Sequence, residues 1–187
     1  FEARKHILEY DDVANEQRKT VYKFRNELLD PNFEVGEKIK QNRAEFVEHL
    51  LAQAEIYAGE PKSEYNLEKL SSVIISSGAF MRPDDLKDLD YAELAEKITA
   101  KFEADYEEKM GVIGADQRRY LEKVLCLQVL DTAWREHLYQ MDILKTGIGL
   151  RGYNQKDPLT EYKKESFNLF MELVSRIKFE SIKILTA

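Results

Sequence analysis

The fold is decided by the stretch Thr146-Gly147-Ile148-Gly149-Leu150-Arg151-Gly152-Tyr153-Asn154-Gln155-Lys156-Asp157-Pro158, which separates two long helical patterns. Glycine inside a helix costs about 1 kcal/mol relative to alanine, so the closely spaced glycines predict that one helix ends near Thr146. Asp157 is then the N-cap of the next helix and Pro158 its first residue. The stretch therefore predicts the tip of a helical hairpin, which exposes Arg151, Tyr153 and Lys156.

Apolar stripes run along both segments that flank the tip. The segment from about 116 to 146 carries its stripe on one helical face, and the segment after Pro158 carries a broader one from Tyr162 to Ile184. Two such stripes joined by a short connection predict an antiparallel helix pair that also packs on a third element. We interpret Trp134 as a core residue. The first stripe comprises Tyr120, Val124, Leu127, Trp134, Leu138 and Met141.

The third element is predicted at the N-terminus. Residues at alternating spacings of four and three form a stripe that repeats about every 3.5 residues, as in a long helix packed lengthwise on others. Gln17 is the single polar member, and Asp30-Pro31 ends the pattern. Asp11 and Asp12 lie off the stripe, on a face that is either solvated or docks a neighbouring domain. The stripe comprises Ala3, Ile7, Tyr10, Ala14, Gln17, Val21, Phe24 and Leu28.

The middle of the chain, 32–114, breaks into shorter pieces. An amphipathic helix runs from Val35 to Tyr57, a short apolar piece at 67–75 fits helix or strand equally well, and 82–85 forms a turn. Asp90 with Glu93 three residues on predicts a capping box at the start of another helix. The predicted fold class is all-α, with a small helical subdomain inserted between long helices.

Composition excludes several classes of protein. A net charge of −7 and a pI near 5.2 argue against a duplex nucleic-acid binder, which needs a basic surface. The single cysteine, Cys126, rules out a disulfide framework and favours a reducing compartment. No apolar run approaches the roughly 20 residues of a membrane span. The chain starts in helical register without methionine or signal-peptide character, so we expect it to be a segment of a larger protein.

No catalytic or metal site is predicted from the residues themselves. The sequence has no phosphate-binding glycine loop, and His6, His49 and His137 do not have metal-ligand spacing. Glu136 and His137 are adjacent on a helix and therefore point about 100° apart, so they cannot face one substrate. The catalytic and metal sets are therefore empty, and the segment is predicted not to be an enzyme.

Several longer motifs carry a resemblance to a known family. They are LEYDDVANEQR at 8–18, LDTAWREHL at 130–138 with Met141-Asp142, LRGYNQKDP at 150–158 and EYKKESF at 161–167. In this order they resemble the C-terminal region of the SecA family, the ATP-driven motors of bacterial preprotein translocation. The resemblance covers the chain from end to end.

The resemblance implies a division into a first scaffold helix (1–30), a helical wing (31–114) and a second scaffold part with a two-helix finger (115–187). In the family the finger enters the cytoplasmic mouth of the SecYEG channel and its tip contacts the moving preprotein, and Tyr153 matches the fingertip tyrosine. The implied tip residues are Arg151, Gly152, Tyr153, Gln155 and Lys156. The implied residues for docking the motor domains are Tyr10, Asp11, Asp12, Asn15 and Arg18.

The resemblance also implies cofactors and a location outside this segment. ATP and Mg²⁺ would bind motor domains that this segment lacks, zinc would bind a C-terminal tail that many members carry, and the segment itself would bind no cofactor. The implied partners are SecYEG, the preprotein, the motor domains in cis and, peripherally, an anionic membrane surface, but no nucleic acid. The implied location is the cytoplasm, at the cytoplasmic face of the inner membrane.

The residues around the tip fit that role. A tyrosine combines apolar area with a polar group and can contact any polypeptide sequence. Five basic residues, against Asp157 and Glu161, make the tip and its flanks locally basic, which suits a polar channel mouth or anionic lipid. The basic residues are Lys145, Arg151, Lys156, Lys163 and Lys164.

Two other functions remain open. The chain could be a helical interaction or regulatory module that docks partners without handling substrate. It could also be an accessory helical subdomain of an RNA helicase, although its acidic charge and its lack of a basic surface with stacking aromatics count against RNA binding.

Overall fold

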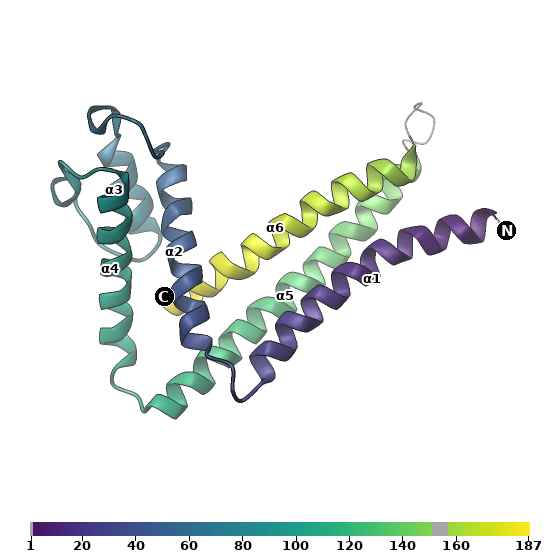
Figure 1. Ribbon diagram of the computed structural model, residues 1–187, viewed down its shortest axis with the longest axis horizontal. Coiled ribbons are helices and arrows are strands. Elements are labelled where there is room, and N and C mark those ends of the chain that lie inside the picture. The colour runs from purple at the N-terminus through teal and green to yellow at the C-terminus, as the bar shows by residue number, and fades with distance from the viewer. Residues whose placement is uncertain (1, 151–156) are drawn as a thin grey trace. The chain divides into compact units, whose positions relative to one another are not determined.

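The computed structural model describes residues 2–150 and 157–187, and every regular element in this part of the chain is helical (Figure 1). The predicted all-α class is confirmed. The α-helices are α1 (Glu2–Leu29), α2 (Val35–Gln53), α3 (Leu67–Ser76), α4 (Tyr91–Met110), α5 (Ala115–Leu150) and α6 (Pro158–Thr186), and the 3-10 helices are η1 (Lys62–Glu64) and η2 (Pro83–Leu86).

The chain forms two compact units. The first unit comprises Phe1–Phe33 and Cys126–Ile177, and the second comprises Glu34–Leu125 and Lys178–Ala187. Helices α5 and α6 therefore each contribute to both units. The predicted division at 30/31 and 114/115 into scaffold, wing and finger concerns functional domains and stays a prediction.

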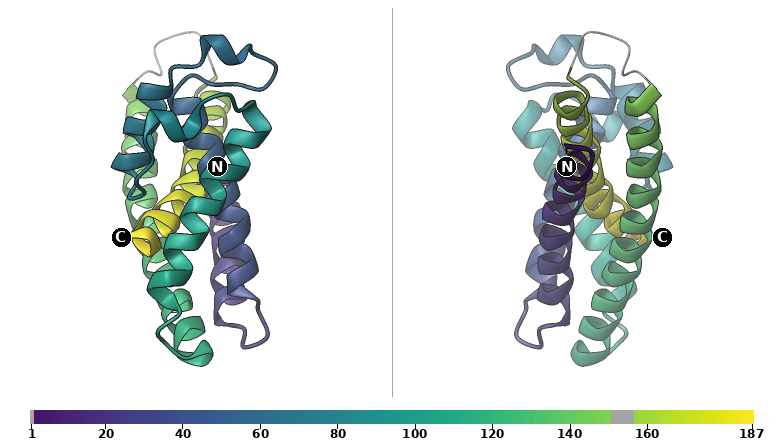
Figure 2. Two further views of the ribbon diagram at one scale, coloured as in Figure 1. Left: turned by 90° about the vertical axis from the view of Figure 1, so that its left-hand side faces the viewer. Right: turned by 90° about the vertical axis from the view of Figure 1, so that its right-hand side faces the viewer.

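In the first unit α1, α5 and α6 lie side by side (Figures 1 and 2). Helix α1 runs antiparallel to α5, because Arg25 pairs with Asp131 at 3.1 Å while the earlier residue Asp11 pairs with the later Lys145 at 3.7 Å. The predicted packing of the N-terminal helix on the hairpin is confirmed.

The buried face of α5 differs from the predicted one. Tyr120 is 72% exposed, and Trp134 and Leu138 are only partly buried. The prediction followed the bulkiest side chains, whereas a small residue and a histidine occupy part of the face that is buried. This face includes Cys126, Leu130, Ala133, His137, Met141, Leu144 and Ile148, which recur at spacings of three and four.

The predicted helix end at Thr146 is wrong, because α5 continues through Gly147 and Gly149 to Leu150. Ile148, between the two glycines, is 1% exposed and belongs to an apolar cluster with Tyr162 of α6. Burying an isoleucine side chain stabilises by about 1.5–3 kcal/mol, which offsets much of the cost of about 1 kcal/mol for each glycine. Tertiary packing therefore extends the helix beyond the point where propensity would end it.

The predicted start of the returning helix is confirmed. Helix α6 begins at Pro158, and the Asp157 carboxylate accepts hydrogen bonds from Leu159 N at 3.3 Å and from the Thr160 hydroxyl at 2.8 Å. This cap satisfies one of the backbone N–H groups that a helix start leaves without an intrahelical partner.

The second unit has a compact apolar core that α2, α3 and α4 build together. The ring of Phe46 on α2 meets Phe102 on α4 edge to face at 6.0 Å and lies 5.8 Å from Phe179 on α6. The apolar piece at 67–75 is a helix, with the Asn66 side chain accepting from Lys69 N. The capping box of Asp90 and Glu93 is confirmed. The fully buried side chains include Phe46, Leu50, Leu70, Ile74, Leu86, Leu94, Ile98 and Phe102.

Helix α2 is shorter than predicted, because it ends at Gln53 and not near Tyr57. Glu55 adopts φ 60°, the N–H of Ile56 donates to the Leu51 carbonyl at 2.9 Å, and the N–H of Glu55 donates to the Ala52 carbonyl at 2.9 Å. This is a Schellman ending, in which a left-handed residue reverses the chain. The ending buries Ile56 at 1% exposure and leaves Tyr57 at 51%.

Substituting Gly78 with alanine is expected to destabilise the protein. Gly78 has φ +106°, and an added Cβ would lie 3.0 Å from Cγ2 of Thr186. We expect Gly78→Ala to lower the free energy of unfolding by about 1–3 kcal/mol in urea titrations. The matched control is Gly147→Ala, whose Cβ meets nothing within 4 Å inside a helix and which should raise stability by about 1 kcal/mol. Equal effects of the two substitutions would show that neither the positive φ of Gly78 nor its contact with Thr186 requires a glycine there.

Candidate functional site

The hairpin end of the first unit is supported by a small apolar cluster, here called the tip-supporting cluster. It consists of Met141, Leu144 and Ile148 of α5 and Tyr162 of α6. Tyr10, Val13 and Leu169 pack against it. The tip residues predicted to contact substrate or channel, Arg151, Gly152, Tyr153, Gln155 and Lys156, lie outside the described residues.

An aromatic pair joins α1 to this cluster. The rings of Tyr10 and Tyr162 are 4.8 Å apart with an interplanar angle of 56°, and the Lys145 ammonium lies 5.8 Å from the centre of the Tyr10 ring. Burial raises the pKa of Tyr162 to about 12, and burial followed by the charge of Asp157 raises the pKa of Tyr10. Both hydroxyls therefore stay protonated at neutral pH. The pair fixes α1 to the tip end of the hairpin through packing.

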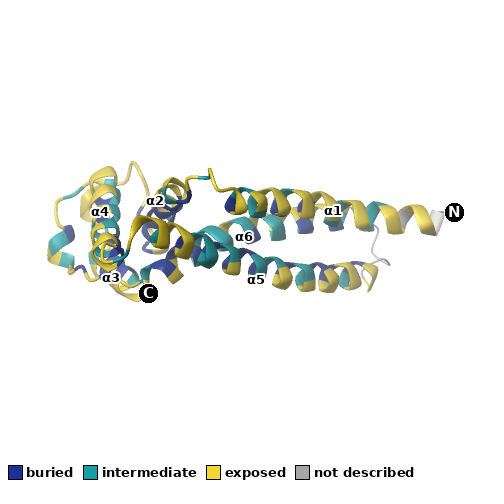
Figure 3. Ribbon diagram, turned by 90° about the horizontal axis from the view of Figure 1, so that it is seen from below, coloured by how far each residue is buried: buried dark blue, intermediate teal, exposed yellow. Residues whose placement is uncertain are grey.

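The five residues predicted to dock a motor domain do not share one environment. Tyr10 is half-buried against Tyr162, and Asp11 forms an ion pair with Lys145 at 3.7 Å. Both therefore contact the hairpin within this unit. The remaining three, Asp12, Asn15 and Arg18, are exposed on α1, whose exposed residues are seen in Figure 3. Docking by these residues stays a prediction.

A buried polar bridge connects all three helices of the unit. The amide nitrogen of Gln17 on α1 donates to the Ser166 carbonyl on α6 at 3.1 Å. Its amide oxygen lies 2.7 Å from Nε2 of His137 on α5 and accepts from it. Gln17, His137 and Ser166 are all buried. A buried polar group is costly unless it is hydrogen-bonded, so this bridge selects one alignment of the three helices.

His137 is held neutral inside the bundle. Its ring stacks 5.5 Å from Trp134 and lies 6.1 Å from Phe170. Burial, followed by the charge of Arg176, lowers the pKa of His137 to about 4. Because Nε2 donates to Gln17, the proton of the neutral ring is on Nε2, and Nδ1 has no hydrogen-bond partner among the described residues. His137 is therefore a structural residue with an unusually low pKa.

The sequence signalled only half of this bridge. Gln17 stands out as the polar member of an apolar stripe, but neither the spacing of the histidines nor the adjacent Glu136 points to His137 as its partner. In the structure Glu136 instead forms an ion pair with Arg176 at 3.2 Å. The signal that identifies His137 is its position as a polar member of the buried α5 residues, which recur at spacings of three and four.

A shallow cavity of about 320 Å³ lies between α1 and α5. Trp134 lines it together with Tyr22 and with the ion pair of Arg25 and Asp131, so the interpretation of Trp134 as a core residue is only partly right. The side chain supports the bundle through His137 and also borders solvent.

Neither a metal site nor a membrane span is found in the described part of the chain. No three His, Cys, Asp or Glu side chains in 2–150 and 157–187 lie close enough together to hold a metal ion. None of the helices described there is both long enough and apolar enough to cross a membrane.

Comparison with known proteins gives a consistent result. The family model described as the SecA wing and scaffold domain matches residues 1–187. Over 186 residues the chain is 65% identical to "Protein translocase subunit SecA" of a Nitratiruptor species, covering 99% of this chain and 22% of that protein. It is 63% identical to the protein of the same name from Campylobacter concisus, covering 99% and 21%. The chain thus spans about a fifth of the length of the curated relatives it matches.

Replacing Gln17 by leucine should destabilise the first unit strongly. The substitution leaves the His137 Nε2–H buried without a partner, whereas the Ser166 carbonyl keeps its place in the hydrogen bonding of α6. One unsatisfied buried donor costs about 1–3 kcal/mol, so we expect a loss of about 1–3 kcal/mol in urea unfolding. Asn15→Ala, on the exposed face of the same helix, is the control and should change stability by less than about 0.5 kcal/mol. If Gln17→Leu lowers the free energy of unfolding no more than Asn15→Ala does, the bridge contributes nothing to stability.

His137 should make stability depend on pH. Its folded pKa of about 4 lies below the value of about 6.5 of an unfolded histidine, so below pH 6.5 the unfolded chain takes up a proton that the folded chain excludes. Stability is therefore complete above pH 6.5 and falls toward pH 4, with about 1 kcal/mol lost between pH 7 and 5.5. Unfolding titrations at both pH values should show a smaller loss in His137→Gln. His49→Gln, the control, should retain the His137 contribution. If the stability of His137→Gln depends on pH as strongly as that of the unchanged protein, His137 does not have a lowered pKa in the folded state.

Proposed function

The chain belongs to the SecA wing and scaffold family, and from this premise we propose that it is the scaffold, wing and finger segment of a protein-translocation motor. In this proposal 1–30 and 115–187 form the scaffold and finger, and 31–114 forms the wing. Hydrolysis of ATP takes place in domains outside this chain, and the scaffold helices couple it to movement of a polypeptide through the SecYEG channel.

The proposal is carried by the way in which α1 braces the helical hairpin formed by α5 and α6. Helix α5 has 36 residues and spans about 54 Å at 1.5 Å per residue. The tip-supporting cluster, the Tyr10–Tyr162 pair and the Gln17 bridge attach this hairpin to α1 at several points along its length. A helix pair braced in this way can transmit displacement from one end to the other, which a loosely tethered loop cannot do.

The chemistry of the tip supports the same role. Tyr153 offers apolar area and a hydroxyl to a polypeptide of any sequence, at the cost of ordering two side-chain torsions. Arg151 and Lys156 beside it, with exposed Lys163 and Lys164 at the start of α6, favour a polar channel mouth or anionic headgroups. We propose that Tyr153 contacts the moving preprotein.

The other assignments of the proposal lie on α1 and beyond the chain. The exposed residues Asp12, Asn15 and Arg18, with Tyr10 and Asp11 at the tip end of the hairpin, face a motor domain of the same polypeptide. ATP and Mg²⁺ bind in the motor domains, and zinc binds in a C-terminal tail, so the segment itself holds no cofactor. The whole protein works at the cytoplasmic face of the bacterial inner membrane.

Site-directed crosslinking from the tip tests the proposal. In the intact motor Cys126, which is buried, is replaced by alanine, and Tyr153→Cys is used to probe a preprotein stalled in the channel. We expect an ATP-dependent crosslink to the preprotein. The matched control is Tyr139→Cys on α5, a tyrosine that is 68% exposed and lies several turns from the tip, and it should not crosslink to the preprotein.

The distribution of crosslinks separates substrate contact from the docking and regulatory role. A crosslink from position 153 to channel loops alone, without the preprotein, would make the hairpin a docking or regulatory element and would overturn substrate contact. Equal crosslinking from positions 153 and 139 would also overturn it, because the contact would then not be specific to the tip.

A further inference from the structure

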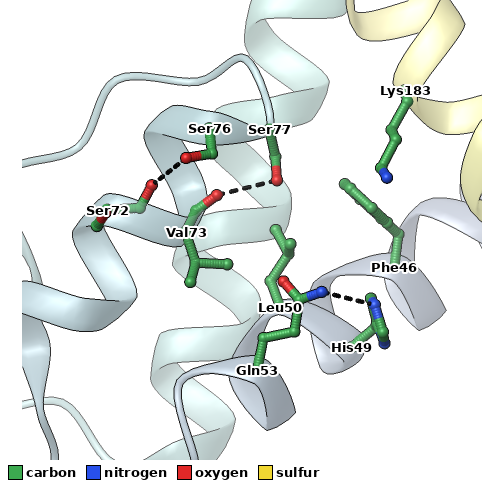
Figure 4. A pocket seen from close by; sticks show the side chains of 9 residues that line it. All are labelled: Phe46, His49, Leu50, Gln53, Ser72, Val73, Ser76, Ser77 and Lys183. Carbon is green, nitrogen blue, oxygen red and sulfur yellow. Dashed lines mark hydrogen bonds between the residues drawn. The ribbon is translucent and has the colours of Figure 1, made fainter.

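The second unit contains a cavity that the proposed function does not use. It has a volume of about 300 Å³ and lies between α2, the end of α3 and the end of α6 (Figure 4). Phe46, Leu50 and Val73 line its apolar side, of which only Val73 is partly exposed, and His49 and Lys183 supply ionisable groups from two different helices. A concave site with an apolar surface and a few polar groups is the usual form of a ligand site.

The serine side of the cavity presents hydrogen-bond acceptors. The Ser76 hydroxyl donates to the Ser72 carbonyl at 2.9 Å, and the Ser77 hydroxyl donates to the Val73 carbonyl at 2.9 Å (Figure 4). Because both hydroxyl protons are used within α3, the lone pairs of the two oxygens remain to accept from a ligand. A ligand in this cavity must therefore supply N–H or O–H groups on this side.

The opposite side presents one cation. The Lys183 side chain extends toward the ring of Phe46 (Figure 4). Its ion pair with Glu180, at 3.6 Å, is weak because both side chains are about half exposed, at 54% and 46%. Lys183 can therefore exchange this partner for the carboxylate of a ligand at little cost.

His49 reports on the charge next to Lys183. The Gln53 amide nitrogen lies 3.0 Å from Nε2 of His49, and since an amide nitrogen only donates, Nε2 accepts and the ring is neutral with its proton on Nδ1. The ring stacks on Phe179 with centroids 4.6 Å apart. Burial, and then the charge of Lys183, lowers the pKa of His49. A negative charge placed beside Lys183 should raise that pKa again.

We propose that this cavity binds an acidic peptide segment of another polypeptide chain. A side-chain carboxylate of the peptide pairs with Lys183, a neighbouring apolar side chain covers the exposed part of Val73, and backbone N–H groups donate to the serine oxygens. Charge complementarity selects an acidic segment. A small inorganic anion fits less well, because the cavity offers it one cation, serine acceptors and an apolar wall.

Nuclear magnetic resonance titration of the 187-residue chain tests the proposal. The probe is the blocked dipeptide acetyl-glutamyl-leucyl-amide, and its glutaminyl counterpart and inorganic phosphate serve as comparison ligands. We expect saturable shifts of the Phe46, His49 and Val73 signals with the glutamyl peptide and an upward shift of the His49 pKa. The glutaminyl peptide should bind about two- to fivefold more weakly, as expected for loss of a half-exposed ion pair.

Two lysine variants on α6 provide the matched pair. Lys183→Gln should weaken binding of the glutamyl peptide by about two- to fivefold, as expected for a half-exposed ion pair. Lys178→Gln removes the same charge from the same helix but pairs with Glu45 outside the cavity, and it should leave the affinity unchanged. Equal weakening by both variants would overturn the site, as would absence of saturable shifts. Equal binding of phosphate and peptide would replace the peptide site by a simple anion site.

Discussion

The first unit depends on the hydrogen bonds of one buried amide. Gln17 uses its nitrogen to reach α6 and its oxygen to reach α5, so a single side chain determines how three long helices align. Apolar stripes alone permit helices to slide by one turn at little cost, because one leucine can replace another in the same groove. A buried amide does not permit this, since a shifted alignment leaves the amide of Gln17 and the Nε2–H of His137 without hydrogen bonds.

This alignment brings together the contacts that support the hairpin next to its tip. With Gln17 opposite His137 and Ser166, Tyr10 comes to lie against Tyr162, and Asp11 comes within reach of Lys145. The tip-supporting cluster then buries Ile148, and α5 continues through two glycines to Leu150. The polar bridge, the aromatic pair and the apolar cluster thus act together to hold α1, α5 and α6 in one alignment.

In the second unit aromatic packing takes the place of a polar bridge. Phe46 contacts Phe102 of α4 and Phe179 of α6, so the end of the last helix becomes part of the core that the middle of the chain builds. The Tyr106 hydroxyl also donates to the Glu122 carboxylate at 2.7 Å, which attaches the start of α5 to α4. These contacts explain why the compact unit includes 115–125 and 178–187, residues that sequence periodicity assigns to the long helices alone.

The sequence by itself determined the helical class, the hairpin, the packing of the N-terminal helix on it, and the caps at Asp157 and Asp90, because periodicity and capping are local properties. Its motifs also identified the family. Only the tertiary structure decided which face of α5 is buried, that Gln17 pairs with His137, and that α5 continues beyond Thr146, where burial of Ile148 outweighs local propensity. These features arise between residues that are distant in the chain, and their energies come from burial and from hydrogen bonds that exist only once the helices have packed.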